Sequence, residues 1–157
     1  NLSLCLIETL GSFRVLEEKD GYIFELQVDE NLFIYGNEPM LKRAIYNLIS
    51  NAVNFTGEDK RVILSLKNIG GRVRFEVTDT GEGIPKEMQG AIWDRYYKSK
   101  NNHKRAIIGT GIGLSIVKNI LILHGADYGV ISEIGKGSTF WFELPFNAGL
   151  CENDFSV

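Results

Sequence analysis

Cysteine is scarce in this sequence, and charge of either sign is not in large excess. Two cysteines, Cys5 and Cys151, occur among 157 residues, and they lie far apart with no metal-binding spacing. We interpret them as a buried helix residue and a tail residue in a reducing compartment. The net charge of −3 gives no reason to expect a nucleic-acid partner or contact with an anionic membrane surface.

Long apolar runs and a leader sequence are also lacking. No apolar run approaches the roughly 20 residues of a membrane span, and no basic leader precedes an apolar block. The chain begins with Asn1 rather than Met, so we expect it to be a fragment. With 44% hydrophobic and 24% charged residues, it has the balance of a soluble globular domain with a real core.

Helical periodicity is clearest over residues 38–55. Apolar residues there sit as adjacent pairs every four residues, and Pro39 suits the first turn. Apolar residues recurring from Leu2 to Leu16 predict an N-terminal helix that stops before Gly21.

Two further helices are expected in the second half. A short one should follow Pro85. The stretch GTGIGLSIVKNILILHG opens a longer one that ends at Gly125. One side of this helix is predicted to carry Ile112, Ile116, Ile120 and Leu123.

Alternation of apolar and polar residues predicts strands that come in adjacent pairs. They are expected at 22–28, 32–35, 61–67 and 72–78, and in a last hairpin over 127–144. This order favours an α+β fold, a two-layer sandwich whose mixed, mostly antiparallel sheet carries helices on one face. It argues against a doubly wound parallel sheet. We expect one domain over 1–146 and a C-terminal tail over 147–157.

The glycine clusters do not match the common phosphate loops. Gly109, Gly111 and Gly113 give G-x-G-x-G without a preceding strand, and Leu114 occupies the third glycine position of a dinucleotide fingerprint. The stretch GKGST (135–139) lacks the upstream glycine of a Walker loop. Each cluster alone is more typical of a turn than of a ligand site.

Asp79 directly follows a predicted strand and precedes two glycines. Gly81 and Gly83 carry no side chain, so the backbone there can approach a flat ligand closely. A carboxylate at this place can accept a hydrogen bond from the exocyclic amine of adenine and would repel the carbonyl of guanine. The alternative is that Asp79-Thr80-Gly81 is only a local turn.

Taken together, five ordered segments resemble the boxes of the histidine-kinase catalytic domain, within the Bergerat-fold ATPases. They are NLISNA, DTGEGIP, IWDRYYKSK, GTGIGLSIVK and GKGSTFWFELP. The resemblance covers nearly the whole chain, to Pro145, and implies a Bergerat fold with a flexible ATP lid. It also implies that the chain binds ATP and Mg²⁺.

One face of the predicted helix 38–55 carries Asn47, Asn51 and Asn54, at spacings of four and three. Amide oxygens are hard, neutral ligands that suit Mg²⁺, although such a row can also be plain surface amides. By resemblance, Asn51 is the principal Mg²⁺ ligand and Asn47 assists it. In the ATP-hydrolysing relatives a glutamate at the position of Asn47 activates water, so an amide here implies slow hydrolysis. Asn54 departs from the family's usual lysine or arginine.

The resemblance assigns further roles. It gives catalytic roles to Asn47, Arg95 and Lys98, although Arg95 can instead only brace the lid. A basic lid closes over the triphosphate, the alternative being a plain solvated loop. Thr139 supports the adenine contact of Asp79, while Phe55 packs near the ribose or base or serves only the core. The nucleotide contacts as a whole are assigned to Asn51, Asn54, Phe55, Asp79, Gly81, Gly83, Ile84, Lys100, Gly109, Thr110, Gly111, Gly113, Leu114 and Thr139.

The partners implied by resemblance lie outside the chain. The phosphoacceptor is a histidine on a separate dimerisation domain, and a response regulator acts downstream. By analogy the parent protein is membrane-anchored with this domain in the cytoplasm and without direct membrane contact of its own. Three alternatives stay open: an anti-sigma-type serine kinase of the same fold, a non-catalytic ATP-binding module, and an ATP hydrolase, against which Asn47 argues.

Overall fold

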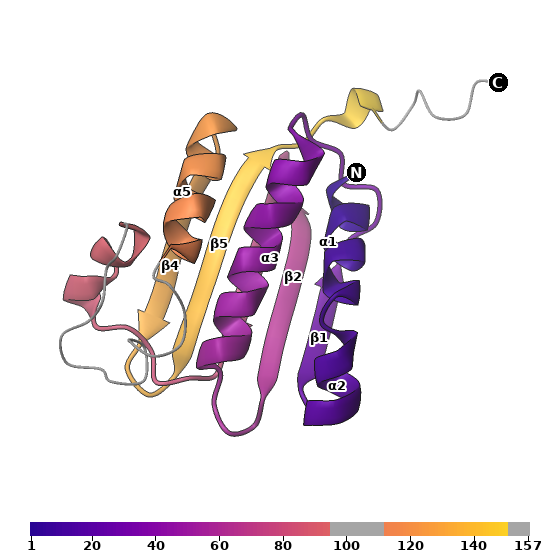
Figure 1. Cartoon of the computed structure of the whole chain (residues 1–157). Helices are drawn as coiled ribbons and strands as arrows, with labels where there is room; N and C mark the ends of the chain where they lie inside the picture. The colour runs from indigo at the N-terminus through magenta and orange to yellow at the C-terminus, as the bar shows by residue number, and fades with distance from the viewer. Residues whose placement is uncertain (95–111, 151–157) are drawn as a thin grey trace.

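The computed structural model describes residues 1–94 and 112–150, and these form one sheet covered on one face by helices (Figure 1). The sheet has five strands in the order β1-β2-β3-β5-β4. Their bounds are β1 Ile23–Val28, β2 Arg61–Ile69, β3 Arg72–Asp79, β4 Asp127–Glu133 and β5 Gly137–Pro145. β1 pairs parallel with β2, whereas the other three pairs are antiparallel. The predicted α+β sandwich with a mixed, mostly antiparallel sheet is confirmed.

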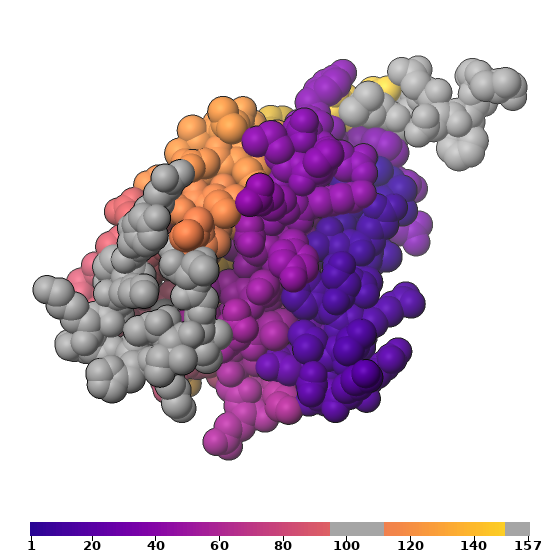
Figure 2. Space-filling view, viewed as in Figure 1, coloured from indigo at the N-terminus to yellow at the C-terminus, as the bar shows by residue number. Residues whose placement is uncertain are grey.

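The helices of the described residues lie side by side over one face of the sheet (Figure 1). α1 (Leu2–Gly11) and α2 (Arg14–Asp20) lie over β1, α3 (Glu38–Phe55) lies in the middle, and α5 (Gly113–Leu123) lies beside it. The space-filling view shows α3 between α5 and the N-terminal helices (Figure 2). Short 3₁₀ turns occur at Lys86–Met88 (η1), Ala91–Trp93 (η2) and Ala148–Leu150 (η3).

Helix α3 matches the predicted residues 38–55 at both ends. The side chain of Asn37 caps it by accepting from the N–H of Met40 at 3.0 Å, and Pro39 lies in the first turn. Most of its apolar stripe is buried in the core, while Met40 and Val53 at the margins are partly buried. The members of this stripe with at most 3% exposure are Leu41, Ala44, Ile45, Leu48, Ile49 and Ala52.

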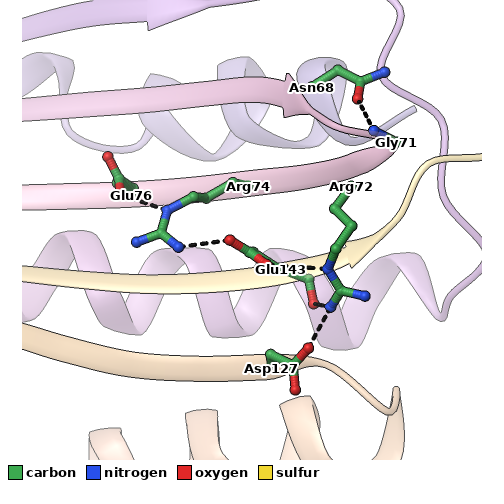
Figure 3. A network of polar contacts seen from close by, with 7 residues as sticks. All are labelled: Asn68, Gly71, Arg72, Arg74, Glu76, Asp127 and Glu143. Atoms are coloured by element: carbon green, nitrogen blue, oxygen red, sulfur yellow. Dashed lines mark hydrogen bonds and ion pairs between the residues drawn. The ribbon is translucent and has the colours of Figure 1, made fainter.

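The core-facing side of the sheet follows the strand alternation. In β3 and β5 every second residue is buried, and the rings of Phe75 and Phe142 pack with centroids 5.2 Å apart. The opposite face of these strands carries charges instead. Figure 3 shows Arg74 between Glu76 and Glu143, and Arg72 between Glu143 and Asp127.

The N-terminal helix is not continuous, so the prediction of one helix through Leu16 is wrong in this detail. The chain turns at Ser12 and resumes a helix at Arg14. The break buries Phe13 to 5% exposure, with its ring centroid 5.1 Å from that of Tyr46. Burial of this aromatic ring outweighs one more turn of regular helix. Cys5 is buried in α1 as predicted, whereas Cys151 lies outside the described residues.

The predicted strand at 32–35 does not form. Its backbone pairs with other segments: the carbonyl of Leu32 accepts from the N–H of Leu2 at 2.8 Å, and that of Phe33 from the N–H of Asn147 at 2.8 Å. β1 pairs instead with β2, which follows β1 in the sequence only after α3. The alternation at 32–35 therefore does not produce a strand, because these carbonyl groups pair with Leu2 and Asn147.

The predicted apolar side of α5 is wrong in part. Leu123 is 72% exposed, and the buried residues are Val117, Ile120 and Leu121. Each residue turns an α-helix by about 100°, so Leu123, two residues beyond the buried Leu121, lies on nearly the opposite side of the helix.

His124 joins the C-terminal end of α5 to the start of α3. Its Nδ1 lies 2.7 Å from the carbonyl oxygen of Ile120, and its Nε2 accepts from the N–H of Asn37 at 3.0 Å. The ring therefore carries its proton on Nδ1. Within the described ranges, no helix combines the length and apolarity needed to cross a bilayer.

Candidate functional site

Asp79 is the last residue of β3, and its side chain is 1% exposed. Its Oδ1 accepts from the N–H of Gly81 at 2.9 Å, which is the Asp-type turn expected as the alternative. A carboxylate has about four acceptor sites, so this turn leaves room for other partners of the same group. The structure thus buries an acidic side chain at the end of the core, where such a group is rare unless it is paired.

The loop after Asp79 contacts the protein itself closely. A Cβ on Gly81 would overlap the carbonyl oxygen of Phe55, and a Cβ on Gly83, where φ is +77°, would overlap that of Glu133. These glycines therefore have an intramolecular reason to lack a side chain, besides the predicted approach to a ligand. Ile84 follows them and is 2% exposed.

Thr80 fixes the same loop to the end of α3. Its hydroxyl lies 3.0 Å from that of Thr56 and accepts from the N–H of Gly57 at 3.2 Å. Phe55, half-buried at the end of α3, is next to this junction. The C-terminal end of α3 and the loop after β3 thus form one edge of the candidate site.

Thr139 does not lie beside the side chain of Asp79, so the predicted arrangement is corrected. Thr139 pairs with Thr78, and their hydroxyl oxygens are 2.8 Å apart. The residue opposite Asp79 is Ser138, which is 2% exposed. Successive side chains of a strand point to opposite faces, so Ser138 faces the core and Thr139 faces away. The sequence signal for Ser138 is the apolar Phe140 two residues further on, because residues two apart in a strand point to the same face.

The asparagine row of α3 is only partly brought together. Asn47 and Asn51 are half-buried, and Nδ2 of Asn47 is shielded from water without a hydrogen-bond partner among the described residues. A Cβ on Gly113 would lie 3.9 Å from Oδ1 of Asn47, so the start of α5 is adjacent. Leu114 follows, partly buried against the core.

An unpaired buried amide is costly, and it indicates a missing polar partner. Because the oxygen and nitrogen of an amide are interchangeable by a flip, the Asn47 side chain suits either a phosphate oxygen or a cation. The neutral oxygen donors of Asn47 and Asn51 fit the ligand preference of Mg²⁺.

Asn54 lies apart from this arrangement. It is exposed and lines a separate open cavity of about 530 Å³ together with residues of α2 such as Leu16 and Asp20. Its neighbours there are Tyr22 and Lys60, and the Lys60 ammonium lies 5.5 Å from the centroid of the Tyr22 ring.

The segment that leads to the predicted lid is fixed by aromatic packing. Trp93 is 5% exposed, and its ring meets those of Tyr128 and Phe140 edge-on at 4.9 and 5.6 Å. Asp94 accepts from Nζ of Lys118 at 3.0 Å, and this hydrogen bond raises the pKa of Lys118. The remaining predicted residues lie outside the described ranges: Arg95, Lys98, Lys100, Gly109, Thr110 and Gly111.

Known proteins are similar to this chain in sequence and fold. The family described as histidine kinase-, DNA gyrase B- and HSP90-like ATPase matches residues 36–148. The chain is 37% identical over 112 residues to the sensor-like histidine kinase SenX3 of Mycolicibacterium smegmatis, covering 71% of this chain and 29% of SenX3. It spans between 16% and 29% of the lengths of three curated relatives, SenX3 among them.

Solved structures agree with the sequence comparison. The catalytic domain of the histidine kinase ThkA superposes with a TM-score of 0.80 at 27% identity, covering 92% of each chain. Full-length ShkA, crystallised with AMPPNP, gives a TM-score of 0.78 at 30% identity, covering 93% of this chain and 30% of ShkA.

Proposed function

The chain belongs to the histidine kinase-, DNA gyrase B- and HSP90-like ATPase family as a catalytic domain of the sensor histidine kinase type, and from this premise we propose its reaction. It binds ATP with Mg²⁺ and transfers the γ-phosphate to a histidine of a separate dimerisation domain in its parent protein. A response regulator then receives the phosphoryl group. The parent is anchored in a membrane, with this domain in the cytoplasm.

The observation that carries this proposal is the burial of Asp79 at the end of β3, where its side chain is 1% exposed. A carboxylate at this depth is poorly accessible to water. It therefore gains from accepting a hydrogen bond from the exocyclic amine of adenine. Guanine presents a carbonyl oxygen instead and is repelled by the charge. Gly81 and Ile84 form the loop that would lie along the base.

The amides of α3 and the start of α5 would bind the triphosphate end of the nucleotide. Asn51 and Asn47 would hold Mg²⁺, and Gly113 opens a helix of 11 residues whose first N–H groups suit phosphate oxygens. An ion held there would supply positive charge that offsets the negative charge developing on the phosphates during transfer. Lys98, Lys100 and Arg95 are proposed to close over the phosphates from the lid.

The same site disfavours hydrolysis. Asn47 occupies the place where a general base for water would act, and an amide cannot take up a proton. ATP therefore persists until an acceptor imidazole reaches the γ-phosphate.

One experiment tests the transfer. The chain is incubated with γ-labelled ATP, Mg²⁺ and the dimerisation domain of its parent, and the label on that domain is followed. Label that is lost in acid and kept in base indicates phosphohistidine and supports the proposal. The reverse stability indicates phosphoserine and favours a serine kinase of the same fold, whereas ATP binding without any label indicates a binding module.

Adenine recognition has its own test. Asp79→Asn removes the charged acceptor and is expected to weaken ATP binding by about 1.5–3 kcal/mol in calorimetry. An unchanged affinity would remove adenine recognition from Asp79.

A further inference from the structure

Ile84, in the loop after Asp79, is held by side chains from two other parts of the chain. Its N–H donates to Oγ of Ser132 in β4 at 2.7 Å, and its carbonyl oxygen accepts from Nε2 of Gln89 at 2.9 Å. Nε2 of Gln89 also donates to the carbonyl oxygen of Ser132 at 3.0 Å. Both backbone polar groups of a residue that is 2% exposed are therefore satisfied by side chains.

The hydroxyl of Ser132 makes two more contacts. Its single proton is donated to the carbonyl oxygen of Gly137 at 2.8 Å. Its contact with Oγ of Ser138, at 2.9 Å, then requires Ser138 to be the donor. Ser138 lies opposite Asp79. The Ser132 hydroxyl therefore orients both the loop after Asp79 and the Ser138 hydroxyl next to Asp79.

We propose that Ser132 and Gln89 are positioning residues that hold the Ile84 loop in the shape that binds adenine, and so set the preference for ATP over GTP. This inference rests on the proposed function and deepens it. A loop that is already fixed loses less conformational freedom when a base binds. Fixing the loop therefore raises the affinity for adenine. Removing the Ser132 hydroxyl leaves the buried N–H of Ile84 unpaired, and the loop then shifts to recover a partner.

A merely structural role for these two side chains makes a different prediction. General loosening of the fold weakens all nucleotides alike, because the phosphates and the base lose the same scaffold. Misplacement of the adenine loop weakens ATP more than GTP, because GTP gains little from that loop. The ratio of the two affinities therefore separates positioning from stability.

The experiment measures dissociation constants of ATP and GTP with Mg²⁺ by calorimetry on the whole chain. We expect Ser132→Ala to bind ATP about tenfold more weakly with little change for GTP, and Gln89→Ala to shift in the same direction by roughly threefold or more. Ser132→Thr keeps a hydroxyl and is expected to restore ATP binding to within about twofold. Ser65→Ala, half-buried on the opposite face of the sheet, is the control and should change neither constant.

The outcomes separate this inference from the proposed function. If the unaltered chain fails to bind ATP, the proposed function falls, and this inference falls with it. If the unaltered chain binds ATP and Gln89→Ala keeps both affinity and preference, this inference alone is overturned. Should Ser132→Ala fail to fold, Gln89→Ala and Ser132→Thr still test the inference. Gln89 lies outside the strands and is only partly buried, so its replacement should not prevent folding.

Discussion

Asp79 and Ser138 lie directly opposite each other in the antiparallel pairing of β3 with β5, and both side chains are buried on the core side of the sheet. The next pair, Thr78 and Thr139, points to the other face. A polar pair thus ends the otherwise apolar rows that these two strands turn toward the core.

Ser138→Ala is expected to weaken ATP binding, whereas Thr139→Ala should leave it nearly unchanged. Ser138 lies beside the buried carboxylate, and loss of one hydroxyl hydrogen bond costs about 1 kcal/mol. Calorimetric titration of both variants with ATP measures the difference. A larger loss from Thr139→Ala than from Ser138→Ala would contradict the placement of the two side chains.

Asn51→Ala should lower phosphotransfer by about 100-fold or more while largely sparing the binding of magnesium-free ATP. The expected cause is loss of a neutral oxygen ligand at the phosphates, where charge develops during transfer. Transfer to the dimerisation domain and ATP binding with and without Mg²⁺ are the measurements. Asn119→Ala, exposed on α5, serves as the matched control, and normal transfer by Asn51→Ala would exclude it as the metal ligand.

Gly81→Ala is expected to destabilise the fold by about 1–3 kcal/mol, because the new methyl group would overlap the carbonyl oxygen of Phe55. Gly90 is the matched control: it is exposed, and no atom lies within 4 Å of the place a Cβ would occupy. Gly90→Ala should therefore change the free energy of unfolding by less than about 1 kcal/mol. Urea denaturation followed by circular dichroism compares the two, and equal stabilities would contradict the close approach.

Glu143→Gln is expected to lower the free energy of unfolding by about 1 kcal/mol at neutral pH. The hydrogen bond from Arg74 holds the pKa of Glu143 below its ordinary value of 4.5 (Figure 3). Below that ordinary value the unfolded chain binds the proton first, so the stabilisation is lost as the pH falls through the lower folded-state pKa.

The difference between the wild type and Glu143→Gln should therefore shrink as the pH drops below about 4.5. Thermal unfolding across this range measures it, with Glu18→Gln, an exposed residue of α2, as the control. A difference that stays constant with pH would show that the ion pairs contribute little.

The sequence predicted α3 to the residue, because a continuous apolar stripe and Pro39 in the first turn agree there. It predicted the hairpins as well, since adjacent strands pair locally. It failed at 32–35 because alternation does not show which backbone groups a segment will pair with. Phe13 was missed as a helix break because its burial depends on Tyr46, which is distant in the sequence.

Residues of the candidate site could be predicted where a sequence motif contains them. The direction of their side chains was harder to predict, because it depends on the fold. Asp79 was identified from its place after a strand, and the roles of Asn47 and Asn51 came from the family resemblance; the structure buries Asp79 and half-buries the two amides, and their roles in binding stay predictions. Thr139 was named from a motif, although strand alternation with the buried Phe140 favours Ser138. Ser132 and Gln89 carry no motif at all, because their importance arises from two hydrogen bonds to Ile84 across the fold.

The imidazole of His124 links the beginning of α3 to the end of α5, at the end of the helix pair opposite Asn47 and Gly113. This contact fixes the distance between the two helix ends. A substitution that removes the ring would therefore be felt first as looser packing of α5 on α3.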